Sequence, residues 1–161
     1  HLLPVKRMYK EAFSRSKLEL AALLHVTVPE NWPHFPEAFT LSDEVRESET
    51  KWNGYFFIHS KDNALVGNGG FVGSPDESGV VEIGYEIATE YWNQGFATEA
   101  VKGMVDYAFA HEEVKAVIAH TLAEKNASNN VLQKIGMKFV EEMANPEVGK
   151  VWRWQISKHL K

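Results

Sequence analysis

The sequence predicts an α/β domain, or α+β in the stricter sense, built on a mixed β-sheet. The first observation is the order of apolar patterns along the chain, which runs helix, strands, helix, strand, helix, strands. The second is size and composition: 161 residues, 44% hydrophobic and 24% charged, can bury a sizeable core without disulfides. We find no internal repeat or linker, and therefore expect a single domain over residues 1–161.

The N-terminal region predicts a short strand followed by helices. Leu2–Lys6 has the pattern of a first strand, and Met8–His25 is helical in tendency, with Ser14 and Ser16 dividing it in two. Three prolines exclude regular structure over Val28–Pro36, because each fixes φ and removes a donor. The aromatic residues of this loop either pack against the core or form a substrate lid.

The middle of the chain changes to a strand period. A short acidic helix is expected over Pro36–Ser48. Trp52–His59 and Ala64–Gly73 then predict two antiparallel strands joined by a turn at Ser60–Asn63. The glycine run Gly67–Gly73 has the wrong spacing for a dinucleotide loop, and we interpret it as strand with a bulge.

A strand over Val80–Ile87 leads into the helix on which the functional interpretation rests. After Gly95 the apolar residues recur on one face of a 3.6-residue period, which predicts a packed helix to Ala108. Gln94 and Gly95 are poor side-chain caps, so the free N–H groups of the first turn could bind an anion. The alternative is that Asn93 caps the helix and Gly95 only permits a tight turn.

The remaining elements complete the sheet. Lys115–Thr121 predicts a strand, and Asn126–Ile135 predicts a helix closed by Gly136. Met137–Glu142 and Val151–Ser157 are the last two strands.

Charge and composition exclude several functions. The net charge of −5 argues against a nucleic-acid partner and mildly favours a cationic one. Without cysteine the chain has no disulfide, thiolate metal site or cysteine nucleophile, and its seven histidines lack metal-ligand spacing. No apolar run approaches the length of a membrane span, and His1–Lys6 is unlike a signal peptide. We expect a cytoplasmic protein with no metal and no membrane partner.

Two segments together resemble a known family. Ile83–Ile87 with Tyr91–Ala100 is similar to the acetyl-CoA pyrophosphate-binding segment of the GNAT superfamily of N-acetyltransferases. His120–Met137 is similar to a second signature of its ribosomal-protein branch, RimJ and RimL, with Met137 in place of a phenylalanine. The resemblance implies a mixed, mostly antiparallel sheet of about seven strands flanked by helices. It also implies a splayed parallel strand pair that forms the acetyl-CoA cleft.

The resemblance also implies which residues bind acetyl-CoA, and it favours the anion-site interpretation. The family pattern Q/R-x-x-G-x-G/A falls on Trp92–Ala97, with Trp92 in place of Gln or Arg. Main-chain N–H groups would cradle the pyrophosphate, and the pantetheine arm would contact the strand end and one side chain. The implied cofactor residues are Ile87, Asn93, Gln94, Gly95, Phe96, Ala97, Thr98 and Asn126.

The catalytic candidates are a glutamate and a serine. Glu82 shares a strand face with Gly84 and resembles the strand glutamate that is the general base in the histone-acetylating branch, with Glu86 as its rival. Ser128 is the general acid that its branch suggests, or only a helix cap. Leu132 stands where many relatives carry a tyrosine that acts as the general acid. His120 is a further candidate, as base or as ligand of the acceptor.

These residues imply direct acetyl transfer to a primary amine in a ternary complex. The alternative is a catalytically weak acyl-CoA-binding module of the same fold. The acceptor could be a protein N-terminus, a polyamine or an aminoglycoside, and we expect a monomer or homodimer. An α-amino group, with a pKa near 7.7 to 8.0, needs less help to become neutral than a lysine near 10.4.

Overall fold

The computed structural model describes residues 2–33, 52, 54–92, 94–123, 127–147 and 149–158. The expected helix over 36–48 lies outside these residues. The elements, in chain order, are β1 (Leu2–Pro4), α1 (Arg7–Arg15), α2 (Lys17–Leu24), β2 (Gly54–His59), β3 (Ala64–Phe71), β4 (Val80–Ile87), the 3₁₀ helix η3 (Thr89–Tyr91), α3 (Phe96–Phe109), β5 (Ala116–Leu122), α4 (Ala127–Lys134), β6 (Lys138–Asn145) and β7 (Gly149–Ser157).

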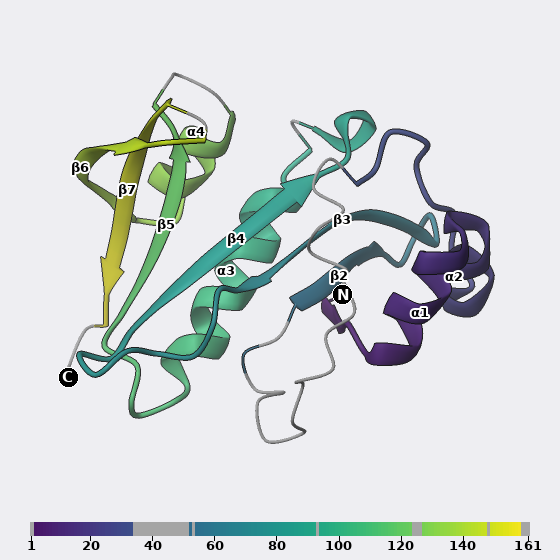
Figure 1. The fold of residues 1–161 in the computed structure, drawn as a ribbon, viewed down its shortest axis with the longest axis horizontal. Helices are drawn as coiled ribbons and strands as arrows, with labels where there is room; N and C mark the ends of the chain where they lie inside the picture. The colour runs from purple at the N-terminus through teal and green to yellow at the C-terminus, as the bar shows by residue number, and fades with distance from the viewer. Residues whose placement is uncertain are drawn as a thin grey trace. The chain divides into compact units, whose positions relative to one another are not determined.

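The strands form one seven-stranded sheet in the order β1-β2-β3-β4-β5-β7-β6. Figure 1 shows β5, β7 and β6 side by side, in green to yellow. The pair β4–β5 is parallel, whereas β1–β2, β2–β3, β5–β7 and β6–β7 are antiparallel. The parallel pair needs a crossover, which α3 supplies. The predicted mixed, mostly antiparallel sheet with helices is therefore confirmed, with strand ends shifted by a few residues.

The chain divides into two compact units, the first made of His1–Gly70 with Tyr85–Phe96 and the second of Phe71–Gly84 with Ala97–Lys161. In the first unit the predicted helix break is confirmed at Ser16. Its hydroxyl accepts a hydrogen bond from the backbone N–H of Glu19 at 3.1 Å, which caps α2.

Trp32 fills the core of the first unit. It is 1% exposed and meets the rings of Phe13 and Phe56 edge-on, while its indole N–H donates to the side-chain carbonyl of buried Asn68 at 2.7 Å. The packing interpretation of the proline-rich loop is therefore confirmed for Trp32, and the loop beyond Pro33 lies outside the described residues. The cluster consists of Val5, Ala12, Leu20, Trp32, Phe56, Leu65 and Ala88.

β3 contains a bulge at Val66, one residue before the Gly67–Gly73 run in which it was predicted. The register to β2 jumps from Gly67 to Leu65, so Val66 is the extra residue, and its carbonyl accepts from the N–H of Ala88 at 2.8 Å. At Gly67 a β-carbon would lie 2.2 Å from the carbonyl oxygen of Glu86. Glycine is therefore required for the close approach of these two backbone segments.

The second unit is held by buried side chains from β4, β5, α3 and α4. At the end of α4 the N–H of Gly136 (φ +96°) bonds to Gln133, and the N–H of Met137 bonds to Leu132 at 3.0 Å. This is a Schellman cap, which confirms the predicted role of Gly136. The fully buried side chains of these four elements include Val81, Ile83, Val101, Met104, Val117 and Leu132.

A buried polar network joins α4 to β5 and β7. The indole N–H of Trp154 donates to the hydroxyl of Thr121 at 3.0 Å and to the side-chain carbonyl of Asn129 at 3.1 Å. The Thr121 hydroxyl in turn donates to Asn129. Since all three groups are buried, the network fixes the position of α4 on this part of the sheet.

Candidate active site

The turn before α3 has the backbone that an anion site needs. Gly95 has φ +84° and precedes Phe96, the first residue of the 14-residue helix. It has no side chain to cap the helix, and a β-carbon there would find no atom of the described residues within 4 Å. The N–H groups of Phe96, Ala97 and Thr98 lack intrahelical partners by position, and the helix dipole is positive at this end.

Aromatic contacts hold the first residue of α3 in place. The ring of Phe96 lies 4.9 Å from that of His59 and 5.7 Å from that of Tyr91, measured between centroids. Burial raises the pKa of the Tyr91 phenol, and the carboxylates of Asp62 and Glu90 raise it further. The phenol of Tyr91 therefore stays neutral. The ring contacts with His59 and Tyr91 hold Phe96, and with it the start of α3, in place.

Trp92 has a role that the sequence did not reveal. Its indole N–H donates to the carbonyl of Ile87 at 2.7 Å, which ties the turn to the end of β4. The sequence predicts a main-chain contact between Ile87 and the cofactor, and the carbonyl of Ile87 already accepts the bond from Trp92. A second lone pair on that oxygen remains. Gln94 is exposed, and its side-chain amide donates to the carbonyl of Glu90 at 3.1 Å.

The parallel ladder between β4 and β5 is short. Paired residues run from Val80 with Ala116 to Ile83 with Ala119, whereas β4 continues to Ile87 and β5 to Leu122. An early end to the ladder is what a splayed pair requires.

Glu82 and His120 meet beside the last pairs of this ladder. Oε1 of Glu82 lies 2.6 Å from Nδ1 of His120, with 30% and 29% of the two side chains exposed. An ionised carboxylate only accepts, so Nδ1 carries the hydrogen of this bond. Gly84, two residues along on the same strand, is exposed, and a β-carbon there would meet nothing within 4 Å. The pair therefore borders open space.

Glu86, the rival base, is in a different environment. It is 8% exposed, whereas Glu82 is partly exposed. A buried carboxylate can reach an external amine less readily than one at the surface of the strand. The predicted residues Asn93 and Asn126 lie outside the described part of the chain, as does the side chain of Ser128, although Ser128 belongs to α4.

Arg153 on β7 was missed by the sequence analysis. It is the register partner of His120, and its Nη1 lies 3.6 Å from Oε1 of Glu141 on β6. Arg153 stands between Trp152 and Trp154 in the sequence. Because successive side chains of a strand point to opposite faces, this pattern predicts a charge on the face opposite the two tryptophans and could have identified Arg153.

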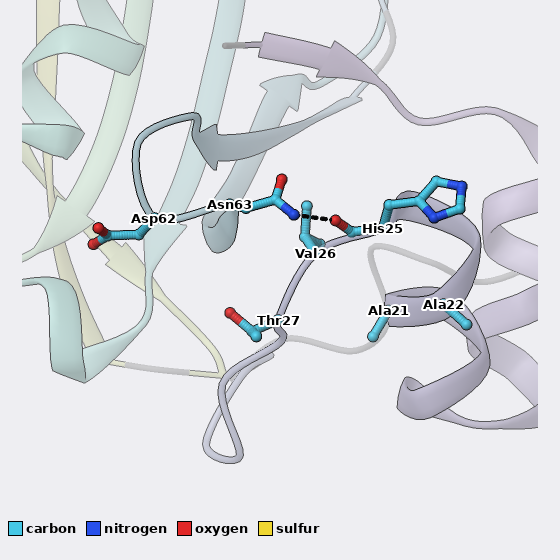
Figure 2. A pocket seen from close by; sticks show the side chains of 7 residues that line it. All are labelled: Ala21, Ala22, His25, Val26, Thr27, Asp62 and Asn63. Atoms are coloured by element: carbon cyan, nitrogen blue, oxygen red, sulfur yellow. Dashed lines mark hydrogen bonds between the residues drawn. The ribbon is translucent and has the colours of Figure 1, made fainter.

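An open hollow of about 590 Å³ lies in the first unit, and its lining includes none of the predicted site residues. Figure 2 shows its lining, where the side-chain amide of Asn63 donates to the carbonyl of His25. In the described ranges no three His, Asp or Glu side chains are placed to hold a metal ion. Within the same ranges, no helix has both the length and the apolar character to span a membrane.

Comparison with known proteins identifies the family. The model of an acetyltransferase (GNAT) domain matches residues 11–138. The chain is 33% identical over 110 residues to the uncharacterized N-acetyltransferase YjdG of Bacillus subtilis (strain 168), covering 65% of this chain and 66% of YjdG. Matches to three such relatives cover between 42% and 66% of the relatives' own lengths.

Solved structures share the fold at lower identity. A variant of spermidine N-acetyltransferase SpeG from Vibrio cholerae has a TM-score of 0.69 at 16% identity, covering 98% of this chain and 94% of SpeG. RimL, a ribosomal alpha-N-protein acetyltransferase in complex with coenzyme A, has a TM-score of 0.66 at 15% identity, covering 97% and 92%. The chain belongs to the GNAT family of acetyltransferases, a family of acyltransferase enzymes.

Proposed function

We propose that this protein is an acetyl-CoA-dependent N-acetyltransferase, with one domain over residues 1–161, that transfers an acetyl group directly to a primary amine in a ternary complex. The observation that carries the proposal is the 2.6 Å contact between Glu82 and His120, next to open space at Gly84 and at the end of the parallel ladder. A partly exposed carboxylate held in one orientation is suited to remove a proton from an incoming amine.

The residues before and within the first turn of α3 would hold the cofactor. An exposed glycine turn with φ +84° and a helix N-terminus fit a diphosphate, since N–H donors and a positive dipole end meet it without an intervening side chain. The proposed contacts are the main chains of Asn93, Gln94, Gly95, Phe96, Ala97, Thr98 and Ile87, with the side chain of Asn126. Bound acetyl-CoA supplies the acetyl group as an activated thioester.

Glu82 acts as the general base in this proposal. Its second carboxylate oxygen, the one that His120 does not engage, accepts the proton that the amine loses as the new C–N bond forms. His120 positions the carboxylate through Nδ1. Ser128 passes a proton to the thiolate released when the C–S bond breaks, directly or through a water molecule, and its hydroxyl takes a replacement proton from solvent.

We further propose that the acceptor is an α-amine, as in the RimJ and RimL branch. RimL, by its name, acetylates protein α-amines, whereas SpeG is a spermidine acetyltransferase, and both share this fold. About a tenth of α-amino groups are neutral at pH 7. A single partly exposed carboxylate therefore suffices in this proposal to take up the proton that the amine loses. We also propose a cytoplasmic monomer or homodimer, in line with a sequence that contains no cysteine.

A second candidate is a binding module with the same fold and weak turnover. It is favoured by Leu132, which is 0% exposed and stands where many relatives carry a tyrosine that acts as the general acid. In that case the protein would respond to acyl-CoA rather than consume it.

Thiol release from acetyl-CoA in the presence of peptide, polyamine and aminoglycoside acceptors separates the two candidates. The enzyme proposal expects release of free thiol that depends on an amine, together with an acetylated product detected by mass spectrometry. Tight binding of CoA by calorimetry, without thiol release from any acceptor, supports the module. Absence of CoA binding overturns both.

A further inference from the structure

Four charged or titratable side chains form a row across one face of the second unit. His120 on β5 and Arg153 on β7 are register partners, as are Arg153 and Glu141 on β6. Directly opposed residues of antiparallel strands project to the same face, with Cβ atoms about 5 Å apart. Glu82 on β4 joins this row through its 2.6 Å contact with His120.

Arg153 has hydrogen-bonding capacity that the protein does not use. Its Nε is buried and, among the described residues, has no hydrogen-bond partner. The ion pair with Glu141 involves Nη1 at 3.6 Å, and 30% of the arginine side chain is exposed. A guanidinium has five N–H donors, so several remain for a ligand. A polar group left without a partner when buried is unfavourable, and a ligand oxygen that reaches it removes that cost.

The place of Arg153 in the row suggests what kind of oxygen it binds. If the acceptor amine lies at Glu82, Arg153 stands on the next strand but one, about 10 Å away between the backbones from a strand spacing near 4.8 Å, and the two long side chains shorten this gap. In an α-amino carbonyl compound the nitrogen and the carbonyl oxygen lie about 3 Å apart, from the bond lengths of the N–Cα–C=O unit. An amine without a carbonyl, such as a polyamine, offers nothing to a guanidinium and repels it.

We propose that Arg153 is a specificity residue that binds the α-carbonyl oxygen of the acceptor, so that this protein selects peptide N-termini or amino-acid amides over simple amines. The inference rests on the proposed function, because it assumes that the amine is presented to Glu82. It assigns Arg153 to acceptor binding and gives it no part in proton transfer.

The test compares two acceptors that differ by one carboxamide, L-phenylalaninamide and 2-phenylethylamine. We expect Arg153→Met to lower the ratio of their kcat/KM values by about tenfold to a hundredfold, the size of a lost hydrogen bond to a charged group. The two amines differ in basicity, so the deciding quantity is the change in this ratio between variant and wild type. Arg153→Lys retains the charge without the fork and should recover part of the loss.

The matched control is Lys150→Met on the same strand. Lys150 is 72% exposed, and its register partner is Ala144 rather than a residue of the row. This variant should leave the ratio within about twofold of wild type, because an exposed ion pair contributes little. An equal ratio in wild type, Arg153→Met and Lys150→Met overturns the inference and leaves the proposed function standing.

Binding to the wild-type protein gives a second measurement that does not depend on a variant folding. Calorimetry in the presence of CoA, at about pH 6 where both amines are mostly protonated, should find the amide bound at least tenfold more tightly. Equal affinities overturn the inference. If the amide binds through Arg153 but no acceptor releases thiol, the binding site stands and the enzyme proposal fails.

Discussion

The carboxylate of Glu82 on β4 and Nδ1 of His120 on β5 lie 2.6 Å apart, although 38 residues separate them in sequence. Both side chains are about 30% exposed, so the pair is neither sealed in the core nor free in solvent. The arrangement is like that of enzymes in which a hydrogen-bonded side chain orients the general base that removes a proton.

Replacing Glu82 with Gln should reduce kcat/KM for an amine acceptor by about a hundredfold to ten-thousandfold, because the amide cannot accept the proton. Thiol release over a range of pH measures this, and the lower limb of the pH profile should change. His120→Gln should cost less and shift that limb, as expected of a positioning residue. Glu77→Gln, in an exposed turn, is the control for charge. Unchanged turnover in Glu82→Gln would refute the assignment of the base.

Gly95→Ala tests the proposed phosphate cradle. The residue has φ +84°, which costs an L-residue about 1 kcal/mol, and the added methyl group would project into space free of other described atoms within 4 Å. We expect CoA affinity to fall about tenfold or more, measured by calorimetry. Gly73→Ala carries a matched strain, since Gly73 has φ +77° and an equally empty surrounding. The Gly73→Ala variant should lose a similar amount of stability and retain CoA binding. Equal affinity for CoA in the Gly95→Ala and Gly73→Ala variants would argue against the phosphate cradle.

Gly67→Ala should destabilise the protein by about 3 kcal/mol. Its β-carbon would lie 2.2 Å from the carbonyl oxygen of Glu86 and 3.0 Å from Cα of Ile87, and backbone atoms cannot move aside cheaply. Chemical denaturation measures the loss. Gly54→Ala is the matched change in the neighbouring strand, where the nearest atom, the carbonyl oxygen of Gly69, is 3.4 Å away. Similar stabilities for the two variants would show that the close approach is not tight in solution.

Trp154→Phe removes the donor that ties β7 to Thr121 and Asn129. Loss of this buried indole N–H should lower the free energy of unfolding by about 2 kcal/mol, since Thr121 and Asn129 each lose one hydrogen bond while keeping the bond between their own side chains. Trp152→Phe is the control, because its indole N–H reaches only the exposed Glu142, at 3.2 Å. Thermal or denaturant unfolding of both variants decides the matter. A larger loss in Trp152→Phe would contradict the role given to the network.

The local pattern of the sequence was enough to predict the helices and strands that the structure describes. A period of two or 3.6 is a property of neighbouring residues, which is why β4, α3 and β5 were predicted to within a few positions. Gly95 and Gly136 could be singled out for the same reason, because a positive φ is a local demand that glycine meets.

Only the tertiary structure decided which side chains meet. The contact of Glu82 with His120 depends on the register of a parallel pair, and a shift of one residue would send either side chain to the other face. The same holds for Arg153 opposite His120, and for the indole of Trp92 on the carbonyl of Ile87. Periodicity says which residues share a face of one strand, but pairing between strands is set by the packing of the whole sheet.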